Sequence, residues 1–117
     1  MSLRKIISIE YILAFVITVF FYGHLNFSWL YFIVFLLLPD ITMVGYLINT
    51  KVGALFYNMG HSFVLPAMIM AIGLLTTTSI PLMAALIWLA HIFLDRALGY
   101  GLKYDDAFKK THLQQIA

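Results

Sequence analysis

Four long apolar stretches, separated by short polar connections, dominate this sequence of 117 residues. Each stretch approaches the roughly 20 residues that an α-helix needs to cross about 30 Å of hydrocarbon. The chain is 63% hydrophobic and only 10% charged, which is too little charge to keep a soluble domain of this size dispersed. The sequence therefore predicts an all-α integral membrane protein of one domain, with helices over residues 6–22, 27–48, 52–75 and 80–99.

The order and orientation of these helices follow from their connections and from the placement of charge. Tight connections favour antiparallel neighbours, so we expect an up-down-up-down four-helix bundle. No small-residue cleavage site follows the first stretch, which therefore reads as a retained helix rather than a signal peptide. All seven cations fall on one side of this topology, so the positive-inside rule predicts that both termini are cytoplasmic. They are Arg4, Lys5, Lys51, Arg96, Lys103, Lys109 and Lys110.

These cations form no broad patch, so nucleic acid is not an expected partner. The tail 103–117 mixes acids, bases and apolar residues, and we expect it to lie along the lipid headgroups. His112 in this tail has no evident role.

Ionisable side chains within the predicted helices are the unusual feature of the chain. Each costs about 2.5–3.5 kcal/mol to insert at the centre of a membrane helix, so such residues usually face the bundle interior and carry function. The set comprises Glu10, Asp40, His61, His91, Asp95 and Arg96.

Helix rise places several of these residues at one depth. Asp40, His61 and His91 each lie about 12–13 Å from the cytoplasmic end of their helix, at 1.5 Å per residue. Asp95 follows His91 by four residues and Asn58 precedes His61 by three, so each pair shares a helix face. Glu10 lies shallower, near the level of Asp95. We therefore predict that the polar residues converge in one layer.

Two imidazoles and two carboxylates in one layer are chemically suited to Zn²⁺, Mn²⁺ or Fe²⁺. The chain has no cysteine, which excludes thiolate sites and disulfides. The predicted metal ligands are Asp40, His61, His91 and Asp95. The predicted catalytic residues are Glu10, as general base or as a hydrogen-bond acceptor behind a ligand, and Asn58 or Arg96, to hold a developing anion. The alternative is that these side chains only form hydrogen bonds between helices.

Two prolines within the predicted helices are expected to kink them. Pro39, beside Asp40, and Pro66, five residues after His61, each remove one backbone hydrogen bond. The carbonyls freed by these prolines are expected at Phe35 and Ser62. Glycines at 53, 60 and 73 are expected to permit close helix packing.

Several motifs resemble one uncharacterised family of small bacterial four-helix membrane proteins. They are Leu37–Asp40, Met43–Tyr46, Tyr57–His61, Leu89–His91, Asp95–Tyr104 and Phe108 with Thr111–Leu113. This resemblance covers nearly the whole chain and implies a bacterial inner-membrane location. A more distant likeness is to the membrane-bound metal-dependent hydrolases, in which Pro39-Asp40, His61 and His91…Asp95 match the expected ligands. The earlier histidine of the central motif in that group is replaced here by Tyr57 or Asn58.

Three functions fit these features. The first is a metal-dependent hydrolase acting on a lipid or other amphiphile, and the second is a small proton-coupled transporter that uses Glu10. The third is a structural or regulatory membrane subunit whose polar residues specify helix pairing. A chain this small leaves little room for a closed cavity, so a homodimer is also expected.

Overall fold

The computed structural model describes residues 2–99 and is all-helical over that range, without strands. Its elements are α1 (Leu3–His24), α2 (Trp29–Phe35), the 3-10 helix η1 (Leu38–Leu47), α3 (Thr50–His61), α4 (Val64–Thr76) and α5 (Ser79–Ala97). Together they form four segments long and apolar enough to cross a membrane: Leu3–His24, Trp29–Leu47, Thr50–Thr76 and Ser79–Ala97. The predicted all-α fold with four spans is confirmed. The up-down order and the cytoplasmic termini stay predictions, and the tail 103–117 lies outside the described residues.

Polar side chains determine where three of the helices begin. Ser2 accepts a hydrogen bond from the backbone of Lys5, and Asn49 accepts one from Val52 at the start of α3. Ser28 caps α2 in the same way. These caps satisfy N–H groups that the first turn of a helix leaves without a partner.

The second and third spans are both broken, as the two prolines predict. Pro39 lies in the first turn of η1, which follows α2 after a two-residue interruption. In the third span α3 ends at His61 and Ser62 is extended, before α4 carries Pro66 in its first turn. Proline supplies no N–H, and its ring clashes with the carbonyl four residues earlier, which is that of Phe35 for Pro39 and that of Ser62 for Pro66. Each helix therefore breaks next to that carbonyl.

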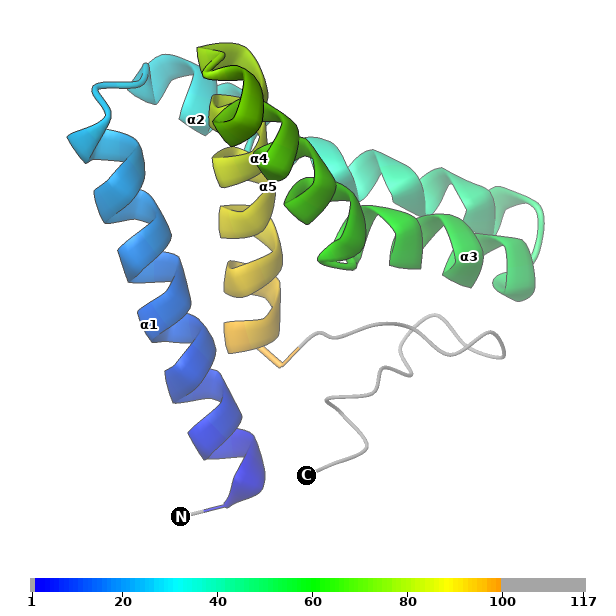
Figure 1. Ribbon diagram of the computed structural model, residues 1–117. Helices are drawn as coiled ribbons and strands as arrows, with labels where there is room; N and C mark the ends of the chain where they lie inside the picture. The colour runs from blue at the N-terminus through cyan, green and yellow to red at the C-terminus, as the bar shows by residue number, and fades with distance from the viewer. Residues whose placement is uncertain (1, 100–117) are drawn as a thin grey trace.

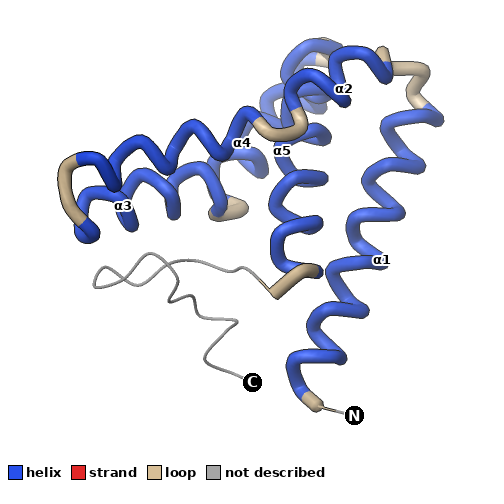
Figure 2. Tube along the Cα trace, turned by 180° about the vertical axis from the view of Figure 1, so that it is seen from behind, coloured by secondary structure: helices blue, strands red, loops and turns tan. Residues whose placement is uncertain are grey.

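The breaks give the molecule two parts that point in different directions. Helices α1 and α5 run side by side, and α4 packs on α5. By contrast, η1 and α3 form a hairpin that projects away from them, which we call the arm (residues 38–61) (Figures 1 and 2). The start of α1 and the end of α5 lie at the same end of the molecule (Figure 1). The prolines predicted kinks within the second and third spans, and the structure turns these kinks into the base of a projecting hairpin.

A small apolar core joins α1, α2 and α5 at the opposite end. It consists of Tyr22, Phe32, Leu86, Ile87 and Ala90, all buried. The hydroxyl of Tyr22 donates a hydrogen bond to the carbonyl of Ser28, which satisfies the polar end of this buried ring. This core holds α5 against α1. The C-terminal half of α5 therefore has a fixed position where the base of the arm contacts it.

Glycines allow the two helices of the arm, η1 and α3, to approach closely. A methyl group on Gly53 of α3 would overlap the ring of Tyr46 on η1, and one on Gly60 would overlap the side chain of Thr42. Small residues play this part commonly in membrane helices, where van der Waals packing replaces the hydrophobic driving force.

We expect Gly53→Ala to lower the free energy of unfolding by about 1–3 kcal/mol, because the new methyl group overpacks the contact with Tyr46. Alanine normally stabilises a helix interior by about 1 kcal/mol over glycine. A decrease in the free energy of unfolding, and not an increase, therefore identifies the close contact with Tyr46. Thermal unfolding in detergent measures the effect. The control is Ala71→Leu at an exposed position of α4, and equal stability of both variants would show that the arm does not depend on this close approach.

Candidate metal centre

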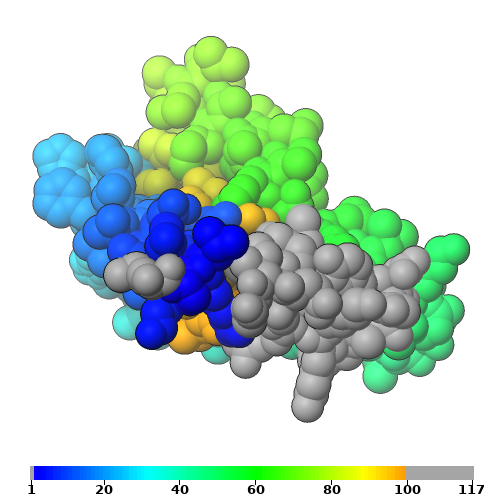
Figure 3. All heavy atoms as spheres, turned by 90° about the horizontal axis from the view of Figure 1, so that it is seen from below, coloured from blue at the N-terminus to red at the C-terminus, as the bar shows by residue number. Residues whose placement is uncertain are grey.

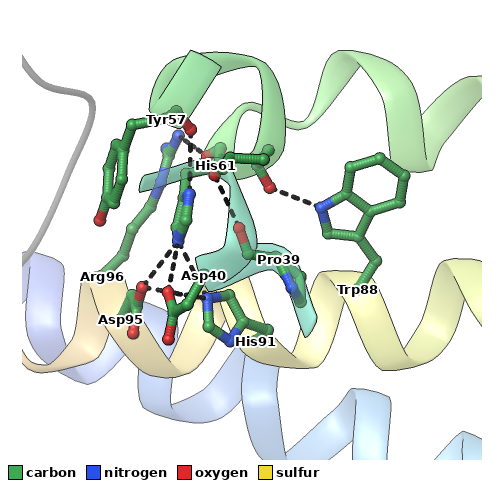
Figure 4. A network of polar contacts seen from close by, with 10 residues as sticks. Pro39, Asp40, Tyr57, His61, Trp88, His91, Asp95 and Arg96 are labelled. Atoms are coloured by element: carbon green, nitrogen blue, oxygen red, sulfur yellow. Dashed lines mark hydrogen bonds and ion pairs between the residues drawn. The ribbon is translucent and has the colours of Figure 1, made fainter. Parts of the chain in front are cut away.

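The structure brings four ionisable side chains from three elements to one point (Figure 4). Asp40 comes from the first turn of η1 and His61 is the last residue of α3. His91 and Asp95 lie one turn apart on α5. The convergence predicted from helix depth is therefore present, although it depends on the broken helices and not on straight ones.

The separations between the ligand atoms are short and nearly uniform. The Nε2 atoms of His61 and His91 are 2.9 Å apart. Each of these nitrogens lies 3.1 Å from Oδ1 of Asp40, and they lie 3.2 Å and 3.3 Å from Oδ2 of Asp95. One donor atom from every residue lies within 4.8 Å of the others.

A tetrahedral metal ion imposes nearly this arrangement. With bonds of about 2.0–2.1 Å, its ligand atoms lie roughly 3.3–3.4 Å apart, since the edge of a tetrahedron is about 1.6 times its centre-to-corner distance. Five of the six separations fall only slightly below that value, and the donor atoms of all four residues lie within 4.8 Å of one another. The donors therefore need little movement to surround one ion.

The protonation of His61 directs a lone pair to the centre. Its Nδ1 lies 2.9 Å from the backbone carbonyl of Tyr57, and because a carbonyl only accepts, Nδ1 must donate. In the neutral ring Nε2 then carries the free lone pair. The ring of Tyr57 stacks on His61 with a centroid separation of 3.8 Å and an interplanar angle of 6°, which holds the imidazole in this orientation.

The second histidine is held less completely. Nδ1 of His91 is buried and has no hydrogen-bond partner of good geometry, although the ring interacts with the backbone of Leu36. Leu36 lies in the interruption between α2 and η1, where backbone groups leave the helical pattern. A carbonyl in this position is the usual partner for the outer nitrogen of a metal-binding histidine.

Burial makes the centre one-sided. His61 and His91 are 3% and 1% exposed, whereas Asp40 and Asp95 are 35% and 22% exposed. The imidazoles therefore form the closed wall of the site, and the carboxylates lie on its accessible side. A molecule approaching the centre meets the aspartates first.

Helix α5 also satisfies the backbone at the end of α3. The indole nitrogen of Trp88 donates to the carbonyl of Gly60, and Nη2 of Arg96 lies 3.4 Å from the carbonyl of His61 (Figure 4). The carbonyl that was expected to lack a hydrogen-bond donor was that of Ser62. Because α3 ends at His61, the carbonyls that need donors are instead those of Gly60 and His61. These two bonds tie the last turn of α3 to the helix that carries His91 and Asp95.

Sequence reasoning missed Trp88 and Tyr57 as parts of this site. Trp88 lies three residues before His91, so it shares that helix face, and this spacing was the available signal. Tyr57 lies four residues before His61, which places its carbonyl and ring directly beneath the imidazole.

The three predicted catalytic residues lie in different surroundings. Arg96 is buried beside the centre, and Asn58 is half-buried on α3 one turn before His61. The side chain of Glu10 is exposed on α1, and none of the described contacts of the four clustered residues involves it. Their catalytic roles stay predictions.

Four apolar spans around a buried cluster of histidine and aspartate define a small multi-pass membrane protein. Within that class, a family model described as "Domain of unknown function (DUF4260)" matches residues 4–116, so the chain belongs to this family. The predicted membership of an uncharacterised family is thus confirmed. Comparisons with curated proteins and with solved structures give no match.

We expect Trp88→Phe to lower the free energy of unfolding by about 1–3 kcal/mol, because it leaves the buried carbonyl of Gly60 without a donor. The matched control is Trp29→Phe, which also removes an indole N–H but at a half-exposed ring on α2. Thermal unfolding in detergent compares them. A loss no greater for Trp88→Phe than for Trp29→Phe would show that the bond to Gly60 does not hold α3.

Proposed function

We propose that this protein binds one divalent transition-metal ion at Asp40, His61, His91 and Asp95 and uses it to hydrolyse a membrane amphiphile. The observation that carries the proposal is the set of five short separations, 2.9–3.3 Å, that join two imidazole nitrogens to each other and to two carboxylate oxygens. Mixed nitrogen and oxygen donors favour Zn²⁺, Mn²⁺ or Fe²⁺ over Ca²⁺ or Mg²⁺.

Charge supports a bound cation. Two carboxylates contact the same pair of imidazole nitrogens, and the three spans that carry these residues are predominantly apolar. Without a cation, protons on the histidines must offset this negative charge, and burying such charges is costly. A divalent ion brings the four side chains to zero net charge with neutral imidazoles, which agrees with the orientation of His61 set by Tyr57.

The hydrolytic step uses the accessible side of the site. A divalent ion supplies a nucleophile there by lowering the pKa of a nearby water molecule towards about 7. Asp40 and Asp95 each turn one oxygen to the centre, and the second oxygen of one of them accepts the proton of that water. The water oxygen bonds to the ester carbon or phosphorus, the bond to the leaving oxygen breaks, and that oxygen takes the proton. The predicted roles of Asn58 and Arg96 belong to this same proposal, and Glu10 is the alternative proton acceptor.

A second function is favoured by the number of protein ligands. Catalytic zinc sites usually have three protein ligands and one open position, whereas this cluster offers four. Hydrolysis then requires an ion that accepts a fifth or sixth ligand, which favours Mn²⁺ or Fe²⁺. A saturated tetrahedral site suits instead the passage of the ion as cargo. The bacterial inner-membrane location and the homodimer are parts of the proposal under either function.

Elemental analysis of the purified protein tests metal binding directly. We expect about one Zn, Mn or Fe per chain, retained in His24→Ala and lost in His61→Ala and His91→Ala. His24 is an exposed histidine at the end of α1, so it controls for nonspecific binding by imidazole. A metal-free protein that takes up no ion on reloading, or an equal loss in His24→Ala, would contradict the proposed site.

Proteoliposomes distinguish hydrolysis from transport. If the centre is hydrolytic, protein loaded with Mn²⁺ or Fe²⁺ releases a water-soluble product from membrane ester substrates, and Asp95→Asn slows release by at least about 100-fold because it removes a charged ligand. If the ion is cargo, an internal metal-sensitive dye responds to external ion and no product appears. A metal-loaded protein that does neither would reject both catalytic and transport functions.

A further inference from the structure

Arg96 is a buried cation whose partners are all neutral. It is 8% exposed, its Nη1 donates to the hydroxyl of Tyr11 at 3.0 Å, and its guanidinium lies 4.1 Å from the ring centre of Phe63. Its Nε is buried and has no hydrogen-bond partner. The ion pairs of the described residues join only histidines to aspartates, so Arg96 has no carboxylate partner among them.

This cation lines a tight cavity with the first turns of α1. The cavity is bounded by Arg4, Ile7, Ser8, Arg96 and Gly99. Gly99 has a φ of +98°, a backbone conformation that favours glycine. A side chain at this position would also overlap the guanidinium of Arg4, so only glycine leaves room for the arginine. Two arginines, one from α1 and one from α5, therefore line the same cavity where α1 begins and α5 ends.

The cavity shares Arg4 and Ser8 with a wider groove. This groove has a volume of about 470 Å³ and is lined by Ser2, Arg4, Lys5, Ser8 and Ile9. Figure 3 looks onto this end of the molecule, with the start of α1 in blue and the end of α5 in orange. Cations, hydroxyl groups and the open N–H groups of a helix N-terminus are the donors that bind phosphate in proteins.

We infer that this groove binds the phosphate group of an anionic membrane lipid through Arg4, Lys5 and the hydroxyl groups of Ser2 and Ser8, with Arg96 in the adjoining tight cavity adding positive charge behind them. A lipid is favoured over free phosphate because the groove leads into apolar surface. Ile9 lines the groove, and Leu13, Val16 and Phe20 continue from it along α1 as exposed side chains at helical spacing. An acyl chain can lie along this stripe while its headgroup contacts the cations.

The positive charge of Arg96 also affects the metal centre. A divalent ion there offsets Asp40 and Asp95, which leaves Arg96 as the uncompensated charge next to His61. The loaded site then carries one net positive charge and favours an anionic ligand. We take the lipid bound in the groove as the substrate of the metal centre. This step rests on the proposed function, whereas binding in the groove does not require a metal.

The experiment measures the thermal stability of the full-length protein in neutral detergent as short-chain phosphatidylglycerol is added. The variants are Arg4→Gln and Ser8→Ala, and Lys51→Gln controls for loss of an exposed cation at the tip of the arm. We expect the apparent Kd to rise at least about tenfold in Arg4→Gln, several-fold in Ser8→Ala, and not at all in Lys51→Gln. Equal effects of Arg4→Gln and Lys51→Gln would overturn the site.

Two further measurements identify the ligand and separate this inference from the metal proposal. Inorganic phosphate and short-chain phosphatidylcholine should stabilise the protein far less than phosphatidylglycerol, and equal stabilisation by inorganic phosphate would overturn the choice of a lipid. The titration is repeated on His61→Ala. If this variant lacks metal but still binds the lipid more tightly than Arg4→Gln does, the groove stands by itself. If the wild type holds metal but Arg4→Gln leaves lipid binding unchanged, only the groove is rejected.

Discussion

The end of α3 is held by hydrogen bonds from α5, and the geometry of the polar cluster depends on these bonds. A broken membrane helix leaves carbonyl groups without donors, and in hydrocarbon each such group costs several kcal/mol. Trp88 and Arg96 supply the donors to Gly60 and His61. Because both come from the helix that carries His91 and Asp95, satisfying the backbone also sets the distance between the histidines.

The two breaks have a common consequence, although they occur in different spans. Proline interrupts the second span just before Asp40 and the third just after His61. Both ligands therefore lie at the base of the arm, where η1 and α3 meet α5, and not midway along straight helices. Packing through Gly53 and Gly60 keeps η1 and α3 together, so Asp40 and His61 reach α5 as one unit. The arm is thus the structural means by which two residues 21 positions apart face one site.

Hydropathy predicts the four spans because the bilayer imposes length and apolarity on any helix that crosses it. Helix rise also predicts the cluster, since equal depth brings residues of neighbouring helices together. Rise gives no direction around the helix, however, and this is why Glu10 was expected near the cluster although its side chain is exposed on α1. In a membrane, lipid-facing and core-facing surfaces are both apolar, so periodicity does not resolve that direction. The arm and the role of Trp88 depend on where α3 ends, which is a tertiary property.

Charge balance connects the cluster with the buried arginine. The two aspartates and Arg96 lie on opposite sides of His61, with the carboxylates at its Nε2 and the guanidinium at its backbone carbonyl. The three charges sum to minus one with neutral imidazoles, and a divalent ion changes that sum to plus one. An anionic ligand in the groove beside Arg4 then offsets the remaining charge. Metal and anion are therefore expected to favour each other's binding, because each reduces the net charge that the other leaves within the membrane.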